Sequence, residues 1–311
     1  MKKIRAYSLV LILIGHNFFQ TIASPKIMVN HFIGIKGREA GLFACFLSVV
    51  NTLWWCDKNN ITPVVSWGKE SLYYQEGGYN GSEEPWEYYF YPVSEIPVSV
   101  ATSQPEAQIW TGWGDPDGTG IQQTECWAKR YKSHLDKSYR REFHAVIKKH
   151  IRIKPVILDK VENFYLRQMR GKTTIGIHLR GTDKKLEAPP ISIEEICKAA
   201  NQYALALPNS QFYIASDDEN LLSRAKHLLN GPIIYYNSFR SANGQPIHFM
   251  DGKAYSKAKL GEEALIEALL LARCTKFVHT RSNLSSSVLF LNPELDNKLL
   301  TDEKFCPLNT R

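Results

Sequence analysis

The fold of this chain is decided by the segment Thr173–Asp183, which reads TTIGIHLRGTD. Its apolar part ends at Leu179 and is typical of a buried strand. Side chains two positions apart lie on the same face of a strand, so His178 and Arg180 point the same way. Gly181 then allows the backbone to turn sharply. The segment therefore predicts a strand that carries a permanently charged guanidinium to its carboxyl end.

Strands and helices are predicted to alternate along the rest of the second half. We expect strands at Gln211–Ala215, Pro232–Tyr236 and Lys276–Thr280, and helices at Ser192–Leu207, Asp218–Leu229, Glu262–Arg273 and Leu284–Leu291. Strands that alternate with helices of this length are typical of right-handed crossovers and a parallel sheet. The second half is therefore predicted to be an α/β domain.

Polar clusters follow three of these predicted strands. They are His178–Asp183, Ser216–Asp218 and Thr280–Ser286. The carboxyl ends of parallel strands open onto one crevice, where ligands bind in sheets of this kind. We therefore expect the three clusters to converge on a single site.

The first cluster suits an anionic ligand. The guanidinium of Arg180 presents a planar fork that matches phosphate oxygens, and Lys184 adds a second positive charge. Asp183 either holds that guanidinium or accepts a hydrogen bond from a sugar hydroxyl. The alternative is a structural pair of Arg180 with Asp183 that closes the strand end.

The third cluster leads from a strand into the start of a helix. Hydroxyls and free backbone N–H groups at a helix start form a natural cradle for a pyrophosphate. Helix capping by Ser282 or Asn283 is the simpler interpretation, and it is compatible with phosphate binding.

Carboxylates near the second cluster and in a later helix each have two interpretations. Asp217 and Asp218 either cap the following helix or bind ribose hydroxyls or a base. Glu267 lies in mid-helix beside Ala268 and Leu269. It is either a solvated residue on the flank of the helix or a carboxylate that accepts hydrogen bonds from guanine.

Composition excludes several classes of protein. The chain has 311 residues, of which 44% are hydrophobic and 22% charged, so it is neither disordered nor short of core material. The net charge is +7, and Lys2, Lys3 and Arg5 supply three of these charges, so a nucleic-acid surface is not indicated. The six cysteines include no CxxC pair, and no HExxH, GxSxG, GxGxxG or Walker motif occurs.

The amino terminus resembles an export signal. Three cations precede the apolar stretch Ala6–Ile14, and small residues follow at Thr21–Ser24. We therefore predict a signal peptide over residues 1–23 and export or a secretory-pathway lumen as the location. The alternatives are an uncleaved signal, which would anchor the chain to a membrane, and a misassigned start. No later apolar run approaches the length of a membrane span.

The first half is aromatic and less regular. A helix is predicted at Gly41–Cys56, a β-rich run at Thr62–Trp67 and a loop region at Tyr73–Pro97. Two helices with charged faces, Ala128–Lys149 and Lys154–Met169, are predicted to connect the halves.

The segment His178–Asp183 fits the pattern HxRxxD, and in it the chain resembles a superfamily of fucosyltransferases. This superfamily contains the core α1,6 enzymes, the bacterial nodulation-factor enzymes and the protein O-fucosyltransferases. The resemblance spans about residues 30–293 and includes Gly34–Asn51, Pro85–Phe90 and Gly261–Pro293. The order of HxRxxD, the SDD triplet and the TxSNxS segment makes it more specific than the first motif alone.

This resemblance implies a GT-B-like fold with two Rossmann-like halves. Residues 24–170 would form the acceptor-side domain with its helical connector, and residues 171–311 the domain that binds the GDP-sugar. The implied reaction is an inverting transfer of L-fucose from GDP-β-L-fucose to a hydroxyl of a glycan or glycoprotein. Neither a metal ion nor a cofactor is expected, because the nucleotide sugar is a substrate.

Residue roles follow from the resemblance by position. Arg180 would contact the diphosphate and stabilise the departing GDP, while His178 and Asp183 shape the donor pocket. Glu267 matches the acidic position that reads guanine or ribose. Catalytic roles are expected of Arg180, Asp183 and Glu187, and donor contacts of His178, Arg180, Lys184, Ser216, Asp217, Asp218, Glu267, Thr280, Ser282, Asn283 and Ser285.

Two positions depart from the pattern of the core α1,6 enzymes. Gly181 stands where those enzymes carry a second arginine, as it does in the protein O-fucosyltransferase branch. Glu187 is the nearest counterpart of the glutamate that activates the acceptor hydroxyl, but it falls one residue short of the family spacing. The acceptor class therefore stays open. Two further alternatives are a transferase that uses another nucleotide sugar and a catalytically inactive protein that binds nucleotide or carbohydrate.

Overall fold

The computed structural model describes residues 32–36, 40–103, 108–110, 136–181, 191–249 and 255–300. The segment TTIGIHL forms β4 (Thr174–Leu179), which is buried along its whole length. It lies at the centre of a parallel sheet with the strand order β6-β5-β4-β7-β8. The other strands are β5 (Gln211–Ser216), β6 (Ile233–Ile234), β7 (Lys276–Thr280) and β8 (Asp296–Leu300). The predicted α/β fold with a parallel sheet is confirmed.

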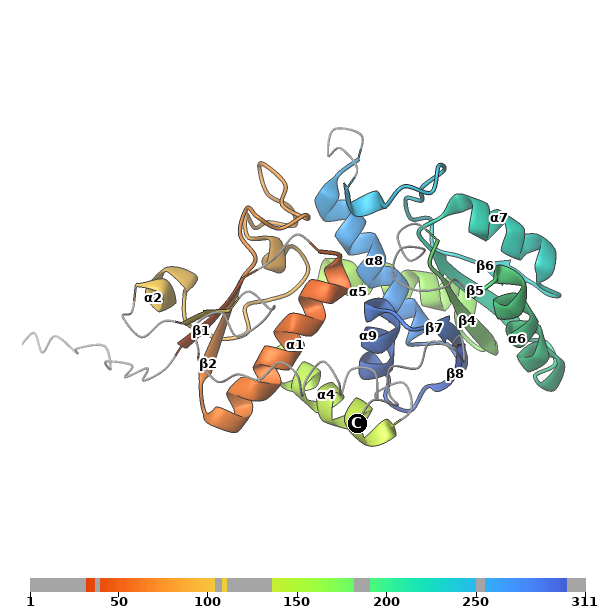
Figure 1. The fold of residues 1–311 in the computed structure, drawn as a ribbon, viewed down its shortest axis with the longest axis horizontal. Helices are drawn as coiled ribbons and strands as arrows, with labels where there is room; N and C mark the ends of the chain where they lie inside the picture. The colour runs from red at the N-terminus through yellow and green to blue at the C-terminus, as the bar shows by residue number, and fades with distance from the viewer. Residues whose placement is uncertain are drawn as a thin grey trace, which may run out of the picture. The chain divides into compact units, whose positions relative to one another are not determined.

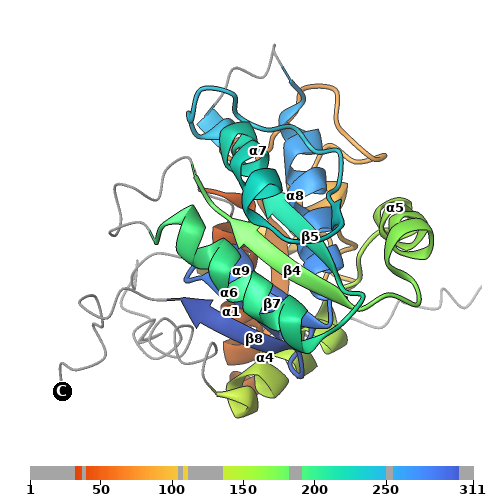
Figure 2. The ribbon, with the colours of Figure 1, turned by 90° about the vertical axis from the view of Figure 1, so that its right-hand side faces the viewer.

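Helices cover both faces of this sheet, as Figures 1 and 2 show. One face carries α6 (Ile193–Ala206) and α7 (Glu219–Leu228), and the other carries α8 (Lys257–Leu271) and α9 (Asn283–Leu291). Burial on both faces explains why β4 is almost continuously apolar.

Alternation along β4 assigns its side chains to the two faces. Ile175, Ile177 and Leu179 pack in the core beneath α6. On the other face, a Cβ on Gly176 would lie 2.8 Å from the sulfur of Cys274, so only glycine allows this close approach of the chain after α8. His178 shares that face. The sequence IGIH therefore directs His178 toward α9.

The first half contains a second parallel sheet, with the order β2-β1-β3. Its strands are β1 (Phe32–Lys36), β2 (Thr62–Ser66) and β3 (Gln108–Trp110). Two parallel sheets, one in each half, give the GT-B-like architecture that the family resemblance implies. Residue patterning predicted only β2, at Thr62–Trp67.

The crossover between β1 and β2 is α1 (Leu42–Asn59), a helix of 18 residues. It extends three residues beyond the predicted end at Cys56. It ends at Asn59, because Asn60 adopts the left-handed conformation, with φ 54°, that terminates a helix. Its residues 42–50 are all buried, since α1 also contacts α8, α9 and α4 (Lys137–His150). Helices of both halves therefore share one hydrophobic core.

The remaining elements connect the two sheets or cover their edges. The loop region 73–97 contains a 3₁₀ turn, η1 (Pro85–Tyr88), and α2 (Val98–Thr102) follows it. The connector consists of α4, α5 (Pro155–Phe164) and the π-helical turn η2 (Tyr165–Met169). Residues 128–135 of the predicted connector and the predicted signal peptide lie outside the described residues.

The sequence overestimated one strand and missed another. The run Pro232–Tyr236 forms only the short strand β6, because the chain then turns into the loop Tyr235–Ser241. The edge strand β8 carries Asp296, Asn297 and Lys298, and no apolar run marks it. In the part of the chain that the structure describes, no helix combines the length and apolarity that crossing a bilayer requires.

Candidate functional site

The carboxyl ends of β4 and β5 are joined by a hydrogen bond. The backbone N–H of Gly181 donates to Oδ1 of Asp217 at 2.9 Å. A Cβ at position 181 would lie 2.8 Å from the Cβ of Asp218 and 2.6 Å from Cδ1 of Leu221. The absence of a second arginine here thus has a steric reason, since Asp218 and Leu221 occupy the space that a side chain would need.

The carboxyl ends of β4 and β7 meet through a histidine and a serine. His178 Nδ1 lies 3.4 Å from Oγ of Ser285, in the first turns of α9. The same hydroxyl donates to the carbonyl of Thr280 at 2.8 Å. These contacts, together with the bond from Gly181 to Asp217, bring all three strand-end clusters to one edge of the sheet.

Ser282 is the N-cap of α9, as the simpler interpretation of this segment predicts. Its Oγ accepts a hydrogen bond from the backbone N–H of Ser285 at 3.0 Å and lies 2.7 Å from the hydroxyl of Ser285. Asn283 is the first helical residue and is half-buried. The backbone N–H groups at the start of α9 therefore lie at the carboxyl-end edge of the sheet, next to His178.

The two aspartates after β5 have different structural partners. Oδ1 of Asp218 accepts the backbone N–H groups of Asn220 at 2.8 Å and Leu221 at 3.1 Å, so Asp218 is the N-cap of α7. Ser216 supports this turn, because its hydroxyl donates to the carbonyl of Asp218 at 3.1 Å. Asp218 therefore caps α7, while Asp217 accepts the hydrogen bond from Gly181 at the end of β4.

Arg180 directly follows β4 at this edge, and its charge affects a tyrosine of the first half. It is half-buried, and its charge opposes the strong rise that burial causes in the pKa of Tyr73. The hydroxyl of Tyr73 accepts the backbone N–H of Leu42, the first residue of α1, at 2.7 Å. Tyr73 therefore contacts the start of α1 and lies within electrostatic reach of Arg180. No sequence signal marked Tyr73, which lies in a predicted loop.

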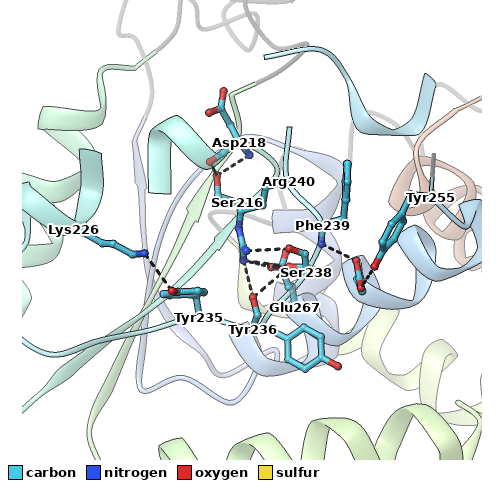
Figure 3. A network of polar contacts seen from close by, with 11 residues as sticks. Ser216, Asp218, Lys226, Tyr235, Tyr236, Ser238, Phe239, Arg240, Tyr255 and Glu267 are labelled. Atoms are coloured by element: carbon cyan, nitrogen blue, oxygen red, sulfur yellow. Dashed lines mark hydrogen bonds and ion pairs between the residues drawn. The ribbon is translucent and has the colours of Figure 1, made fainter. Parts of the chain in front are cut away.

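Glu267 is buried on α8, so its interpretation as a solvated residue is wrong. Figure 3 shows its carboxylate within a network formed by the loop that follows β6. The hydroxyl of Ser238 donates to Oε1 of Glu267, and Nη2 of Arg240 donates to the same oxygen at 3.3 Å. Burial raises the pKa of Glu267 to about 8, although Ser238 and Arg240 oppose this rise. Sequence reasoning identified neither Ser238 nor Arg240.

Three predicted site residues, Asp183, Lys184 and Glu187, lie outside the described residues. Two surface hollows, of about 370 and 390 Å³, are lined by Gly77–Glu83 and by residues of α6 with Leu228. Neither hollow contains a predicted site residue. Within the described ranges, no three His, Cys, Asp or Glu side chains are grouped as metal ligands would be.

Comparison with known proteins identifies the fold. No family profile matches the sequence, and no curated protein matches it. Among solved structures, the chain is similar to NodZ α-1,6-fucosyltransferase soaked with GDP-fucose, with a TM-score of 0.53 and 17% identity over 84% of this chain and 92% of NodZ. Fucosyltransferase NodZ from Bradyrhizobium, in a second structure, gives a TM-score of 0.52 at 16% identity over 84% and 91% of the two chains.

A plant enzyme has the same fold. A variant of Arabidopsis thaliana FUT1 in complex with GDP matches with a TM-score of 0.55 and 11% identity over 91% of this chain and 74% of FUT1. These matches cover between 84% and 91% of this chain. The chain therefore has the GT-B-like fold of the fucosyltransferases.

Proposed function

We propose that this protein is a glycosyltransferase that moves L-fucose from GDP-β-L-fucose to a hydroxyl of a glycan or glycoprotein, with inversion at the transferred carbon. The observation that carries the proposal is that three polar strand ends lie together next to Arg180. Hydrogen-bonding contacts between Gly181 and Asp217 and between His178 and Ser285 connect them. The similar structures of NodZ and FUT1 hold GDP or GDP-fucose, which favours a nucleotide sugar as the ligand of this edge.

The proposed chemistry depends on charge that develops on the leaving group. As the bond between fucose and the β-phosphate breaks, GDP gains negative charge, and preorganised cations and N–H donors lower the barrier. Arg180 supplies the cation, and the N–H groups at the start of α9 supply donors. Because the guanidinium needs no proton transfer, this stabilisation is available across the physiological pH range.

The acceptor hydroxyl needs a base within about 3 Å. We propose Glu187 for this role, and we propose that Asp183 and His178 shape the donor pocket. We propose that the reaction needs no metal ion, and that the protein acts after export into a secretory lumen or beyond the cell.

The experiment uses GDP binding and donor turnover by the full chain and by the Arg180→Ala variant. We expect GDP to raise the Tm of the wild-type protein and the Arg180→Ala variant to lose both this shift and transfer. The control is Arg224→Ala, because Arg224 is an exposed α7 arginine paired with Glu194. A GDP response that Arg180→Ala leaves unchanged contradicts the proposal. Hydrolysis assays with GDP-fucose, GDP-mannose and UDP-sugars identify the donor.

A second candidate function is nucleotide or carbohydrate binding without transfer. It is favoured by Gly181, because Asp218 and Leu221 leave no room for a second arginine at this strand end. This candidate predicts GDP binding with no turnover on any acceptor of a glycan array. Measurable hydrolysis of GDP-fucose, lost in Arg180→Ala, eliminates it.

A further inference from the structure

The loop Tyr235–Ser241 ties α8 to the carboxyl end of β5. At one end, the backbone N–H of Ser241 donates to the carbonyl of Asp217 at 2.9 Å, and the N–H of Glu219 donates to the carbonyl of Ser241 at 3.0 Å. At the other end, the N–H of Phe239 donates to Oε2 of Glu263, on α8, at 2.9 Å. The loop thus lies between two elements of the candidate site.

Arg240 holds this loop together from within. Its side chain is only 4% exposed. Nη1 donates to the carbonyl of Ser238 at 3.0 Å, and Nη2 donates to the carbonyl of Tyr236 at 2.7 Å and to the hydroxyl of Ser238 at 3.2 Å. The ring of Tyr235 lies 5.3 Å from the guanidinium carbon, a cation–π distance. These contacts hold Arg240 in place independently of its contact with Glu267, as Figure 3 illustrates.

The contacts to Glu267 are concentrated on one of its two oxygens. Oε1 receives both the hydroxyl of Ser238 and Nη2 of Arg240. Oε2 has no hydrogen-bond partner among the residues that the structure describes. Since Nε of Arg240 is buried, a ligand does not reach the guanidinium through that atom. The arrangement orients the carboxylate and leaves one oxygen to accept further hydrogen bonds.

We propose that Arg240 is a positioning residue that fixes the carboxylate of Glu267 in the orientation in which it accepts hydrogen bonds from the guanine of the donor. This inference rests on the function proposed above. Guanine offers two adjacent donors, N1–H and the exocyclic amine, that suit a charged carboxylate, so binding near pH 7 requires Glu267 to release its proton, and Arg240 lowers the cost of that release. A neutral carboxylic acid accepts these hydrogen bonds less well, because one of its oxygens carries a proton.

The charges around Glu267 explain why a buried cation is needed there. Asp217 after β5 and Glu263 on α8 both carry negative charge that disfavours ionisation of Glu267, and burial acts in the same direction. Burial raises the pKa values of Tyr213 and Tyr236, and the charge of Glu267 adds to both rises. Arg240 is the positive group that opposes these effects on Glu267, together with the hydroxyl of Ser238. Without Arg240, Glu267 is expected to stay neutral to a higher pH.

The test compares Arg240→Gln, Arg240→Lys and Ser238→Ala with the wild type, using calorimetric Kd values for GDP and for inosine diphosphate between pH 6.5 and 9. Inosine diphosphate lacks the exocyclic amine and so offers Glu267 one donor instead of two. Arg224→Gln is the matched control, because it makes the same chemical change on the exposed face of α7.

We expect Arg240→Gln to raise the Kd for GDP about 10- to 100-fold at pH 7. The preference for GDP over inosine diphosphate should shrink. The loss should also diminish toward pH 9, because the wild-type Glu267 is already largely ionised above pH 8 while the carboxyl of the variant still gains charge. Arg240→Lys keeps the charge and should recover part of the affinity and the wild-type pH profile, while Arg224→Gln should behave as the wild type. If Arg240→Gln does not fold, as judged by circular dichroism, Ser238→Ala gives the same comparison in a milder form.

The outcomes separate this inference from the proposed function. If the wild type binds no GDP, the proposed function fails and the inference falls with it. If the wild type binds GDP but the variants lose affinity equally at every pH and keep the GDP preference, Arg240 has only a structural role. That result overturns the inference and leaves the proposed function intact.

Discussion

The backbone N–H of Gly181 donates to Asp217 at 2.9 Å, while Asp218, the next residue along the chain, fills the space beside the Cα of Gly181. One glycine thus brings the ends of β4 and β5 together. The close approach requires a residue without a Cβ, and the hydrogen bond requires that residue's amide. Arg180 is held next to this contact, so its position depends on it.

Replacing Gly181 with alanine should therefore damage both stability and ligand binding. The added Cβ would lie 2.7 Å from Oδ2 of Asp218, so the turn must shift. We expect Gly181→Ala to lower the free energy of unfolding by about 1–3 kcal/mol, as overpacking does, and to weaken GDP binding. Urea denaturation and GDP titration measure the two effects.

The control for this substitution is Gly41→Ala. Gly41 has an ordinary φ of −59°, and a Cβ there would meet nothing within 4 Å. Because Gly41 is the N-cap of α1, where alanine is less favourable than glycine, the variant should lose at most about 1 kcal/mol of stability. Equal stability losses in the two variants would contradict the steric explanation.

The cap of α9 gives a second prediction. Ser282→Ala removes the acceptor for the backbone N–H of Ser285, so the free energy of unfolding should fall by about 1 kcal/mol. GDP affinity should fall as well, because the start of α9 loses its fixed geometry. Ser192→Ala removes the cap of α6, which accepts the N–H of Glu195 at 3.2 Å. The Ser192→Ala control should lose a similar amount of stability and keep the GDP affinity of the wild type. If Ser192→Ala lost as much GDP affinity as Ser282→Ala, that result would argue against a ligand at the start of α9.

The buried carboxylate of Glu267 predicts a pH dependence of stability. Its pKa is raised from 4.5 to about 8, so folding takes up a proton between these values and the stability it contributes is lost as pH rises through that window. The loss has an upper limit of about 1.4 kcal/mol per pH unit. Glu267→Gln cannot titrate, so the free energy of unfolding of the wild type should fall relative to this variant from pH 5 to pH 8. Parallel pH profiles of the two proteins would show that Glu267 does not titrate in this window.

The carboxylate of Glu262 connects α8 with α5 and with the loop region 73–97, so its removal should lower the stability of the fold. Glu262 is 2% exposed and accepts from Lys160 of α5 and from Nδ2 of Asn80, the latter at 3.2 Å. We expect Glu262→Ala to lower the free energy of unfolding by about 2 kcal/mol, because it removes the buried acceptor that Lys160 and Asn80 share. Lys160 is partly exposed and can regain water, which limits the loss.

Glu294 provides the comparison for Glu262, because its bridges to Lys137 and Arg141 are exposed. Glu294→Ala should leave the denaturation midpoint unchanged within error. Equal effects of the two substitutions would mean that burial of Glu262 does not govern its contribution.

The sequence alone determined the parallel sheet of the second half and the edge of it at which polar residues gather. Both are encoded locally, since the apolar period sets the strands and helices and the carboxyl ends of parallel strands must share one edge. The same patterns left Asp217 or Asp218, and Ser282 or Asn283, as candidate helix caps, and the structure selects Asp218 and Ser282. The first sheet had only one recognisable strand from residue patterning, because β1 has Gly34 at its centre and β3 has only three residues.

The tertiary structure alone decided which side chains meet across the fold. Arg240 and Glu267 are 27 positions apart, and the carboxylate of Glu262 on α8 accepts from Asn80 in the first half. Neither pairing leaves a periodic trace in the sequence, because both depend on how α8 packs against the rest of the fold. Burial of Glu267 was likewise undecidable from its neighbours in sequence, since the face of a helix that meets another element is chosen by packing and not by the helix itself.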